Sequence, residues 1–76
     1  MNNARRKKIN NIVAQIEAAM QEANDILDEE QDYYDNMPES FQDSERGEIA
    51  QEAIDNLESA IENLEEAIDS LNDAAT

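Results

Sequence analysis

Residues 53–73 read AIDNLES, AIENLEE and AIDSLND, three successive heptads that each begin Ala-Ile-x-x-Leu. With Leu57, Leu64 and Leu71 at heptad position a, the alanines fall at d and the isoleucines at e. Side chains at these positions share one face of an α-helix, because residues three and four apart are neighbours on its surface. The strict period predicts a left-handed coiled coil, and alanine at d predicts that two helix axes approach closely.

The first half of the chain carries the same pattern. Apolar residues again occupy positions a, d and e when Ile9 is placed at a, and only Glu30 interrupts the a positions. Position d then holds Ile12, Ala19, Ile26 and Tyr33, and position e holds Val13, Met20, Leu27 and Tyr34. We therefore predict two long amphipathic helices with matching apolar faces.

One short connector separates the two predicted helices. Pro38 disfavours the α conformation at the residue before it, and Asn36 tolerates the left-handed backbone with which a helix can end, so the first helix should span about residues 4–36. The connector is then residues 37–43, and the second helix spans about residues 44–74. With a single glycine and a single proline in the chain, no strand is expected.

The connector and the start of the second helix contain three informative residues. Glu39 after a proline suits the first turn of a short helical piece. Ser44 is the expected N-cap of the second helix, with its hydroxyl accepting a hydrogen bond from a free backbone N–H. Gly47 is costly in a first helical turn, so it predicts a close backbone contact with Phe41 or the Tyr33–Tyr34 region.

Connector length and charge both predict that the helices are antiparallel. A connector this short places sequential helices side by side. Bases at residues 5–8 stand at a helix N-terminus and acids at residues 65–73 stand at a helix C-terminus, and each placement opposes the helix dipole. An antiparallel pair sets these two regions beside each other. The fold class predicted for residues 1–76 is a single all-α domain, an antiparallel two-helix hairpin of coiled-coil type.

The width of the apolar face predicts self-association. Three of every seven positions are apolar, whereas a seam between two helices needs only two. A chain of 76 residues also buries only a modest fraction of its surface. The expected assembly is a homodimer that forms an antiparallel four-helix bundle.

Composition excludes several classes of function. The chain has no cysteine and no histidine, so we expect no enzyme activity, no metal site and no cofactor. A formal net charge of −15 repels nucleic acid and anionic membranes, so direct binding to either is not expected. Bases at residues 5–8 resemble the start of a signal peptide, but polar residues soon interrupt the apolar stretch after them, and a soluble cytoplasmic protein is expected.

Two groups of residues are candidates for binding a partner. Tyr33, Tyr34 and Phe41 are the only aromatic residues, and with Met37 they stand where the hairpin turns. They either complete the core and cap the end of the bundle or anchor an interface. Acids on the second helix could contact a basic protein; the candidates are Asp55, Glu58, Glu62, Glu65 and Asp69.

Three hypotheses of function arise from these candidates. The first is a non-enzymatic module that binds and modulates another protein through its end or its acidic face. The second is a DNA mimic, because acids spaced densely along a rod approach the charge density of a duplex and could occupy the basic groove of a nucleic-acid-binding protein. The third is a structural coil that only oligomerises.

The connector also carries a resemblance. Residues 36–42, NMPESFQ, and residues 44–48, SERGE, followed by LE at 57–58 and LEEAI at 64–68, resemble small acidic helical proteins of bacteria and their tailed phages or prophages. The resemblance covers roughly residues 28–75. It implies an accessory gene product that acts by binding a host or phage protein, and it carries over no functional residues.

Overall fold

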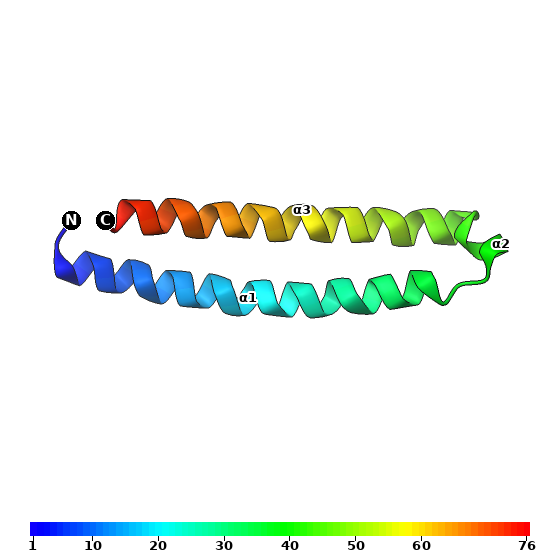
Figure 1. The fold of residues 1–76 in the computed structure, drawn as a ribbon, viewed down its shortest axis with the longest axis horizontal. Coiled ribbons are helices and arrows are strands. Elements are labelled where there is room, and N and C mark those ends of the chain that lie inside the picture. The colour runs from blue at the N-terminus through cyan, green and yellow to red at the C-terminus, as the bar shows by residue number, and fades with distance from the viewer.

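Two long helices lie side by side along almost the whole chain. The computed structural model describes all 76 residues. Helix α1 (Asn3–Asp35) and helix α3 (Glu45–Ala74) run antiparallel, with the short α2 (Glu39–Gln42) at the turn and both termini at the opposite end (Figure 1). The rod measures 58 × 15 × 12 Å. The predicted all-α class is confirmed, and the helix bounds lie within one or two residues of those predicted.

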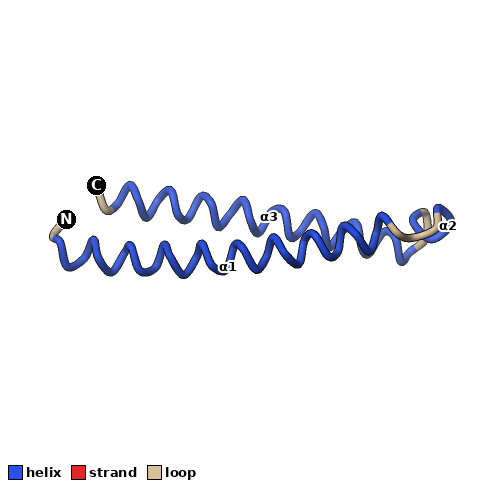
Figure 2. The backbone as a smooth tube through the Cα atoms, turned by 60° about the horizontal axis from the view of Figure 1, so that its bottom comes forward, coloured by secondary structure: helices blue, strands red, loops and turns tan.

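Figure 2 shows that the two long helices are inclined to each other. The two helices lie side by side in Figure 1, but in the turned view of Figure 2 they cross toward the end that holds α2. Their axes are therefore inclined to each other, as expected for helices that pack through a heptad repeat.

Hydrogen bonds at the open end cap α1 and join its start to the end of the chain. The Asn2 side chain caps α1 by accepting from the Arg5 backbone N–H at 2.8 Å. The Arg6 Nε donates to the Ala75 carbonyl at 2.9 Å. The predicted neighbourhood of basic start and acidic end is thus present, and this contact joins a cation to the C-terminal carbonyls of α3 instead of to a carboxylate side chain.

The connector is tied to both long helices. The Gln42 Nε2 donates to the Tyr34 carbonyl at 2.9 Å, which fastens α2 to α1. Ser44 occupies the N-cap position of α3, as predicted, but its hydroxyl makes no capping bond. It donates instead to the Phe41 carbonyl. The predicted capping bond is therefore wrong, because the last turn of α2 presents a carbonyl that has no partner inside that helix and lies within reach of the same hydroxyl.

Gly47 brings the backbones of α2 and α3 together. The residue is buried, and a Cβ atom built on it would lie 2.0 Å from the Gln42 carbonyl oxygen and 2.6 Å from the Gln42 Cα. Its φ is negative, so the glycine is required for space and not for backbone conformation. The predicted close approach is confirmed, and it is made to Gln42, not to Phe41 or the tyrosines.

Heptad positions a and e form the seam between α1 and α3. The covered residues of each helix follow alternating steps of three and four. On α1 they are Arg6, Ile9, Val13, Ile16, Met20, Ala23, Leu27, Glu30, Tyr34 and, just beyond the helix, Met37. On α3 and its C-cap they are Gly47, Ala50, Ile54, Leu57, Ile61, Leu64, Ile68, Leu71 and Ala75, and Ala53 and Ala67 at position d are half-buried beside them. Only five residues of the chain are fully buried, so this core is thin.

Position d lies at the edge of the seam. Ile12, Ile26 and Tyr33 are 44%, 51% and 50% exposed, and Ala19 and Ala60 are exposed as well, whereas Ala53 and Ala67 are half-buried. The expectation that alanine at d lets the two helix axes approach closely stays a prediction, and of these alanines Ala53 and Ala67 border the seam.

The composition of α3 explains the choice of seam. Pairing positions a and e covers Ile54, Ile61 and Ile68, whereas pairing a and d would cover only alanines in their place. Full burial of an isoleucine stabilises a fold by about 1.5–3 kcal/mol, far more than burial of an alanine. The a and e rows therefore pack together, and the d row of α1 stays uncovered.

Candidate partner-binding surfaces

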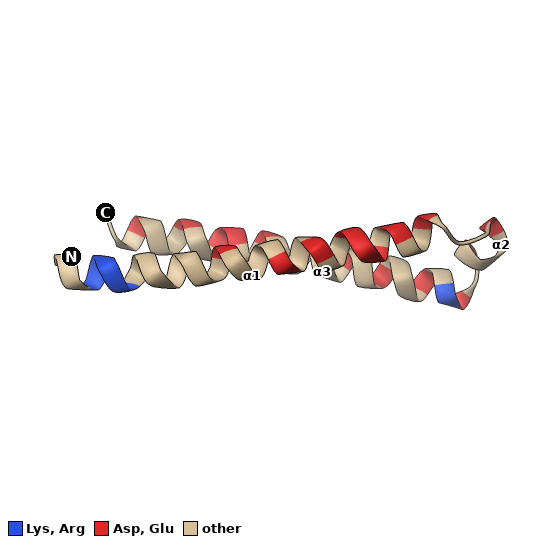
Figure 3. Cartoon of the chain, turned by 90° about the horizontal axis from the view of Figure 1, so that it is seen from below, with Lys and Arg blue, Asp and Glu red and all other residues tan.

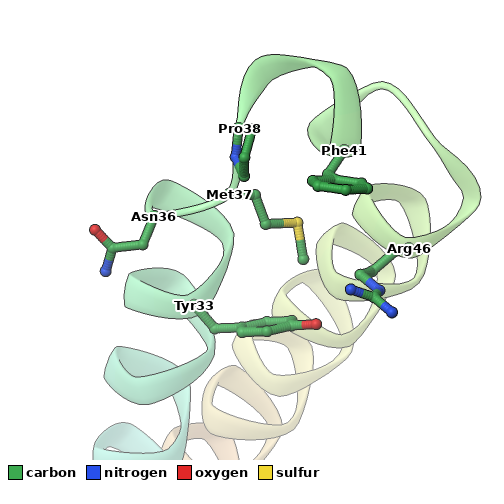
Figure 4. Close-up of a pocket in the computed structure, with 6 residues that line it drawn as sticks. All are labelled: Tyr33, Asn36, Met37, Pro38, Phe41 and Arg46. Atoms are coloured by element: carbon green, nitrogen blue, oxygen red, sulfur yellow. The ribbon is translucent and has the colours of Figure 1, made fainter.

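A pocket opens at the turn end of the hairpin. It has a volume of about 400 Å³ and receives side chains from both long helices, from α2 and from the links between them (Figure 4). Its lining residues are Tyr33, Asn36, Met37, Pro38, Phe41 and Arg46. We call this the turn-end pocket. Both of its rings are about half exposed, so apolar surface is presented to solvent at this end.

Two rings, a thioether and a cation shape the turn-end pocket. In Figure 4 the Met37 side chain points between the rings of Tyr33 and Phe41, and Arg46 lies along one side. The Arg46 guanidinium is 5.8 Å from the centroid of the Phe41 ring, a cation–π distance. Arg46 is the only base after Lys8, so this pocket holds the one positive charge outside the N-terminal cluster.

A second hollow continues from the first along the rod. It has a volume of about 290 Å³ and shares Tyr33 and Arg46 with the turn-end pocket. Its other lining residues are Glu30, Glu45, Ile49 and Ala50. Glu30, the carboxylate that interrupts the a positions, is half-buried here, in the same hollow as Arg46.

The structure brings together three of the four predicted residues at the turn. Tyr33, Met37 and Phe41 line one pocket, but Tyr34 lines neither hollow and belongs to the seam. Sequence reasoning had not assigned Arg46 or Ile49 to this site. The available signals were a lone base in an acidic region and an isoleucine outside the a, d and e positions.

The predicted acids form a separate surface. Asp55, Glu58, Glu62, Glu65 and Asp69 are all exposed and follow each other at steps of three and four along one face of α3. We call them the acidic row. They occupy positions b and f, on the other side of the seam from position d, so they lie away from Tyr33 and Arg46. Figure 3 shows acids along both long helices, and bases at the start of α1 and near the turn, where the sequence has Arg46.

The excess of acids makes stability depend on salt. Twenty acids against five bases repel one another across a rod only 15 Å wide, and added salt screens that repulsion. We expect the midpoint of thermal unfolding to rise by several degrees between about 20 mM and about 500 mM NaCl. Circular dichroism at a series of salt concentrations measures this. A midpoint that falls with salt would mean that attractive ion pairs outweigh the repulsion.

No group of three or more Asp, Glu, His or Cys side chains is placed to hold a metal ion. Neither long helix contains an apolar stretch that could cross a lipid bilayer. Comparisons with models of protein families, with curated proteins and with solved structures found no match to this chain.

Proposed function

We propose that this chain is a non-enzymatic protein–protein interaction module that binds and modulates a basic partner protein. The observation that carries the proposal is the turn-end pocket, an apolar hollow of about 400 Å³ with a single cation on its wall. The partner inserts a side chain there, while the acidic row attracts its positive surface. The hairpin acts as a homodimer in a four-helix bundle.

The composition of the pocket supports its role as an anchor site. Aromatic residues, methionine and arginine are enriched at interfaces, and a few of them supply most of the binding energy. The exposed Phe41 and Tyr33 rings offer a partner apolar area without any unfolding of the hairpin. Because the rings belong to α2 and α1 and the cation belongs to α3, the folded turn is needed to present all three.

The acidic row supports the choice of a basic partner. A net charge of −15 on a narrow rod raises the rate of encounter with positively charged proteins and suppresses encounter with acidic ones. This effect is lost at high salt, whereas insertion of a side chain into the pocket is much less sensitive to salt. The two surfaces therefore contribute differently, one to the rate of association and the other to its strength.

The origin and location of the protein belong to the same proposal. The resemblance of residues 28–75 to small acidic helical proteins points to an accessory protein of a bacterium or of a phage. Its place of action is the cytoplasm of the bacterial cell, where basic nucleic-acid-binding proteins are abundant targets.

The test uses three chains as baits and compares the proteins that each one captures. The baits are the wild-type chain, Phe41→Ala and the control Asn11→Ala. Both changed residues are exposed, but Asn11 lies on the outer face of α1 at the far end of the rod. We expect proteins bound by the wild type and the control to be at least tenfold depleted with Phe41→Ala, as expected for a loss of about 1.4 kcal/mol or more. Equal capture by all three baits would refute the role of the pocket.

DNA mimicry is the second candidate, and the regularity of the acidic row favours it. Five carboxylates over about 21 Å of α3 present a linear array of negative charge. If the partner binds this array through its nucleic-acid groove, excess duplex DNA displaces the chain, and the triple variant Asp55→Asn, Glu62→Gln, Asp69→Asn no longer binds. Binding that persists in excess DNA would exclude mimicry.

A further inference from the structure

One face of the rod is largely apolar, and the acids that border it, Glu22 and Glu29, lie at position g of α1. The d row of α1 presents Ile12, Ala19, Ile26 and Tyr33, and the d row of α3 presents mostly alanines. The residues next to it on α3, at position g, are also uncharged; they are Ile49, Asn56, Asn63 and Ser70. Every Asp and Glu of α3 lies at b, c or f. We call this surface the d face.

The two d rows flank the same side of the seam. In an antiparallel pair, rows with the same heptad letter lie on the same side, and the shared hollow of Tyr33, Arg46 and Ile49 confirms this at the turn end. The two d rows also stay level with each other along the rod. Tyr33 lies beside Arg46 near the turn, and Arg6 is bonded to Ala75 at the open end. Between these two points both helices rise by about 1.5 Å per residue. Counting along the helices sets Ala19 level with Ala60 and Ile26 level with Ala53.

The size of the d face matches what a stable dimer buries. A face of 58 × 15 Å covers roughly 900 Å², and specific interfaces bury about 800 Å² on each partner. The chain exposes 5598 Å², whereas a compact monomer of 8.6 kDa exposes about 4,700 Å². The chain therefore exposes more surface than a compact monomer of its mass, and the difference is close to the area that a dimer contact would bury on each copy.

Charge identifies the occupant of this face as a second copy. Two chains of net charge −15 repel through any contact that brings their acids together. On the d face the opposing rows are apolar or uncharged on α3, so two copies meet there without pairing their acidic rows. The same contact leaves Asp55, Glu62 and the other members of the acidic row free for a partner.

Side-chain size and charge also select the arrangement of the two copies. A two-fold axis along the rod lays α1 of each copy on α3 of the other, so Ile12 and Ile26 each meet an alanine at their own level, and Tyr33 meets Arg46. It also sets Glu22 and Glu29, at position g of α1, beside the uncharged g row of the other copy. An axis across the rod would lay α1 on α1 and bring these acids of the two copies together, which is unfavourable.

We infer that a second copy of this chain packs on the d face with both hairpin turns at the same end. This inference rests on the homodimer of the proposed function and adds its interface. It places two turn-end pockets beside each other, with Tyr33 of each copy next to Arg46 of the other. A partner protein therefore meets a composite surface of two pockets, built by both copies.

Ala19→Asp and Ala18→Asp provide a matched pair for testing the interface. The residues are adjacent in α1, both are exposed in the single hairpin, and the change in charge and helix propensity is identical. Ala19 belongs to the d face and Ala18 to the outer face of α1. In sedimentation at several protein concentrations we expect the wild type and Ala18→Asp to be dimers and Ala19→Asp to dissociate at least tenfold more readily. A monomeric wild type, or equal dissociation of both variants, would overturn the inference.

Introduced cysteines test the arrangement, because the chain has none of its own. Ala19→Cys and Ala60→Cys chains are unfolded together, refolded as a mixture and oxidised. The inferred axis predicts a mixed disulfide between the two chains as the main product, and its near absence would overturn the arrangement. Sedimentation and cross-linking need no partner, so a dimer on the d face that captures nothing would disprove the proposed function while leaving this inference intact.

Discussion

Replacing Ile54 with alanine is expected to lower the free energy of unfolding by about 2–5 kcal/mol. Ile54 is 1% exposed and is the only large side chain of the chain that is fully enclosed. Truncation removes its burial and leaves a cavity that two rigid helices cannot close. In a fold with only five buried residues, a loss of this size approaches the whole stability of a small domain.

Gln21→Ala is the control for this prediction. It also truncates a side chain to alanine within a long helix, but Gln21 is exposed and lies off both the seam and the d face, so we expect a change of about 0.5 kcal/mol or less. Urea unfolding followed by far-UV circular dichroism, at one fixed protein concentration, measures both variants against the wild type. If both variants lower the free energy of unfolding by the same amount, burial in the a and e seam is not the main source of the stability of the fold.

Much of the fold is set by helix chemistry that is local in the sequence. Pro38 ends the first helix because the residue before a proline avoids the α conformation, and α1 ends at Asp35. The left-handed backbone predicted for Asn36 is wrong, because this C-cap residue has a φ of −87° and a ψ of −2°. The three Ala-Ile-x-x-Leu heptads predict the apolar face of the second helix, and the connector is too short for any arrangement other than an antiparallel pair. Local propensity and tertiary packing agree in these elements, so reasoning from the sequence succeeds there.

The choice of seam is not local, and sequence reasoning therefore missed it. Positions a and d and positions a and e both repeat at steps of three and four, so periodicity alone does not distinguish them. The decision depends on comparing both helices at once: Ile61 at e gains more from burial than Ala60 at d. Once that comparison is made, the exposure of Ile26 on the other helix is explained.

The site shows the same division between local and tertiary information. Tyr33, Met37 and Phe41 were predicted because they lie close together in the sequence at the turn. Arg46 joins them only because α3 begins with a turn that folds back beneath α2, a placement that depends on Gly47 and Gln42. The position of the cation thus depends on a backbone contact that no periodic pattern reports.

Gly47→Ala is expected to destabilise the chain, although alanine is the better helix former. Helix propensity alone would raise the free energy of unfolding by about 1 kcal/mol. The added Cβ would lie 2.0 Å from the Gln42 carbonyl oxygen, and backbone atoms of a packed turn cannot move aside without displacing α2. Overpacking of this kind costs about 1–3 kcal/mol, so the net result is a loss or at best no gain.

The rate of trypsin cleavage at the turn tests whether the added Cβ displaces α2. Arg46 is the only site for trypsin beyond Lys8, so cleavage after it reports the opening of the turn, and a variant destabilised elsewhere shows how much of the cleavage comes from unfolding of the whole chain. We expect faster cleavage and weaker partner capture in Gly47→Ala, because Phe41 moves with α2. Ala18→Gly, at an exposed position of α1, calibrates the propensity effect and should leave cleavage at Arg46 nearly unchanged. A Gly47→Ala chain that is more stable by the propensity difference, and is cut no faster, would show that α2 does not rest on α3 through this glycine.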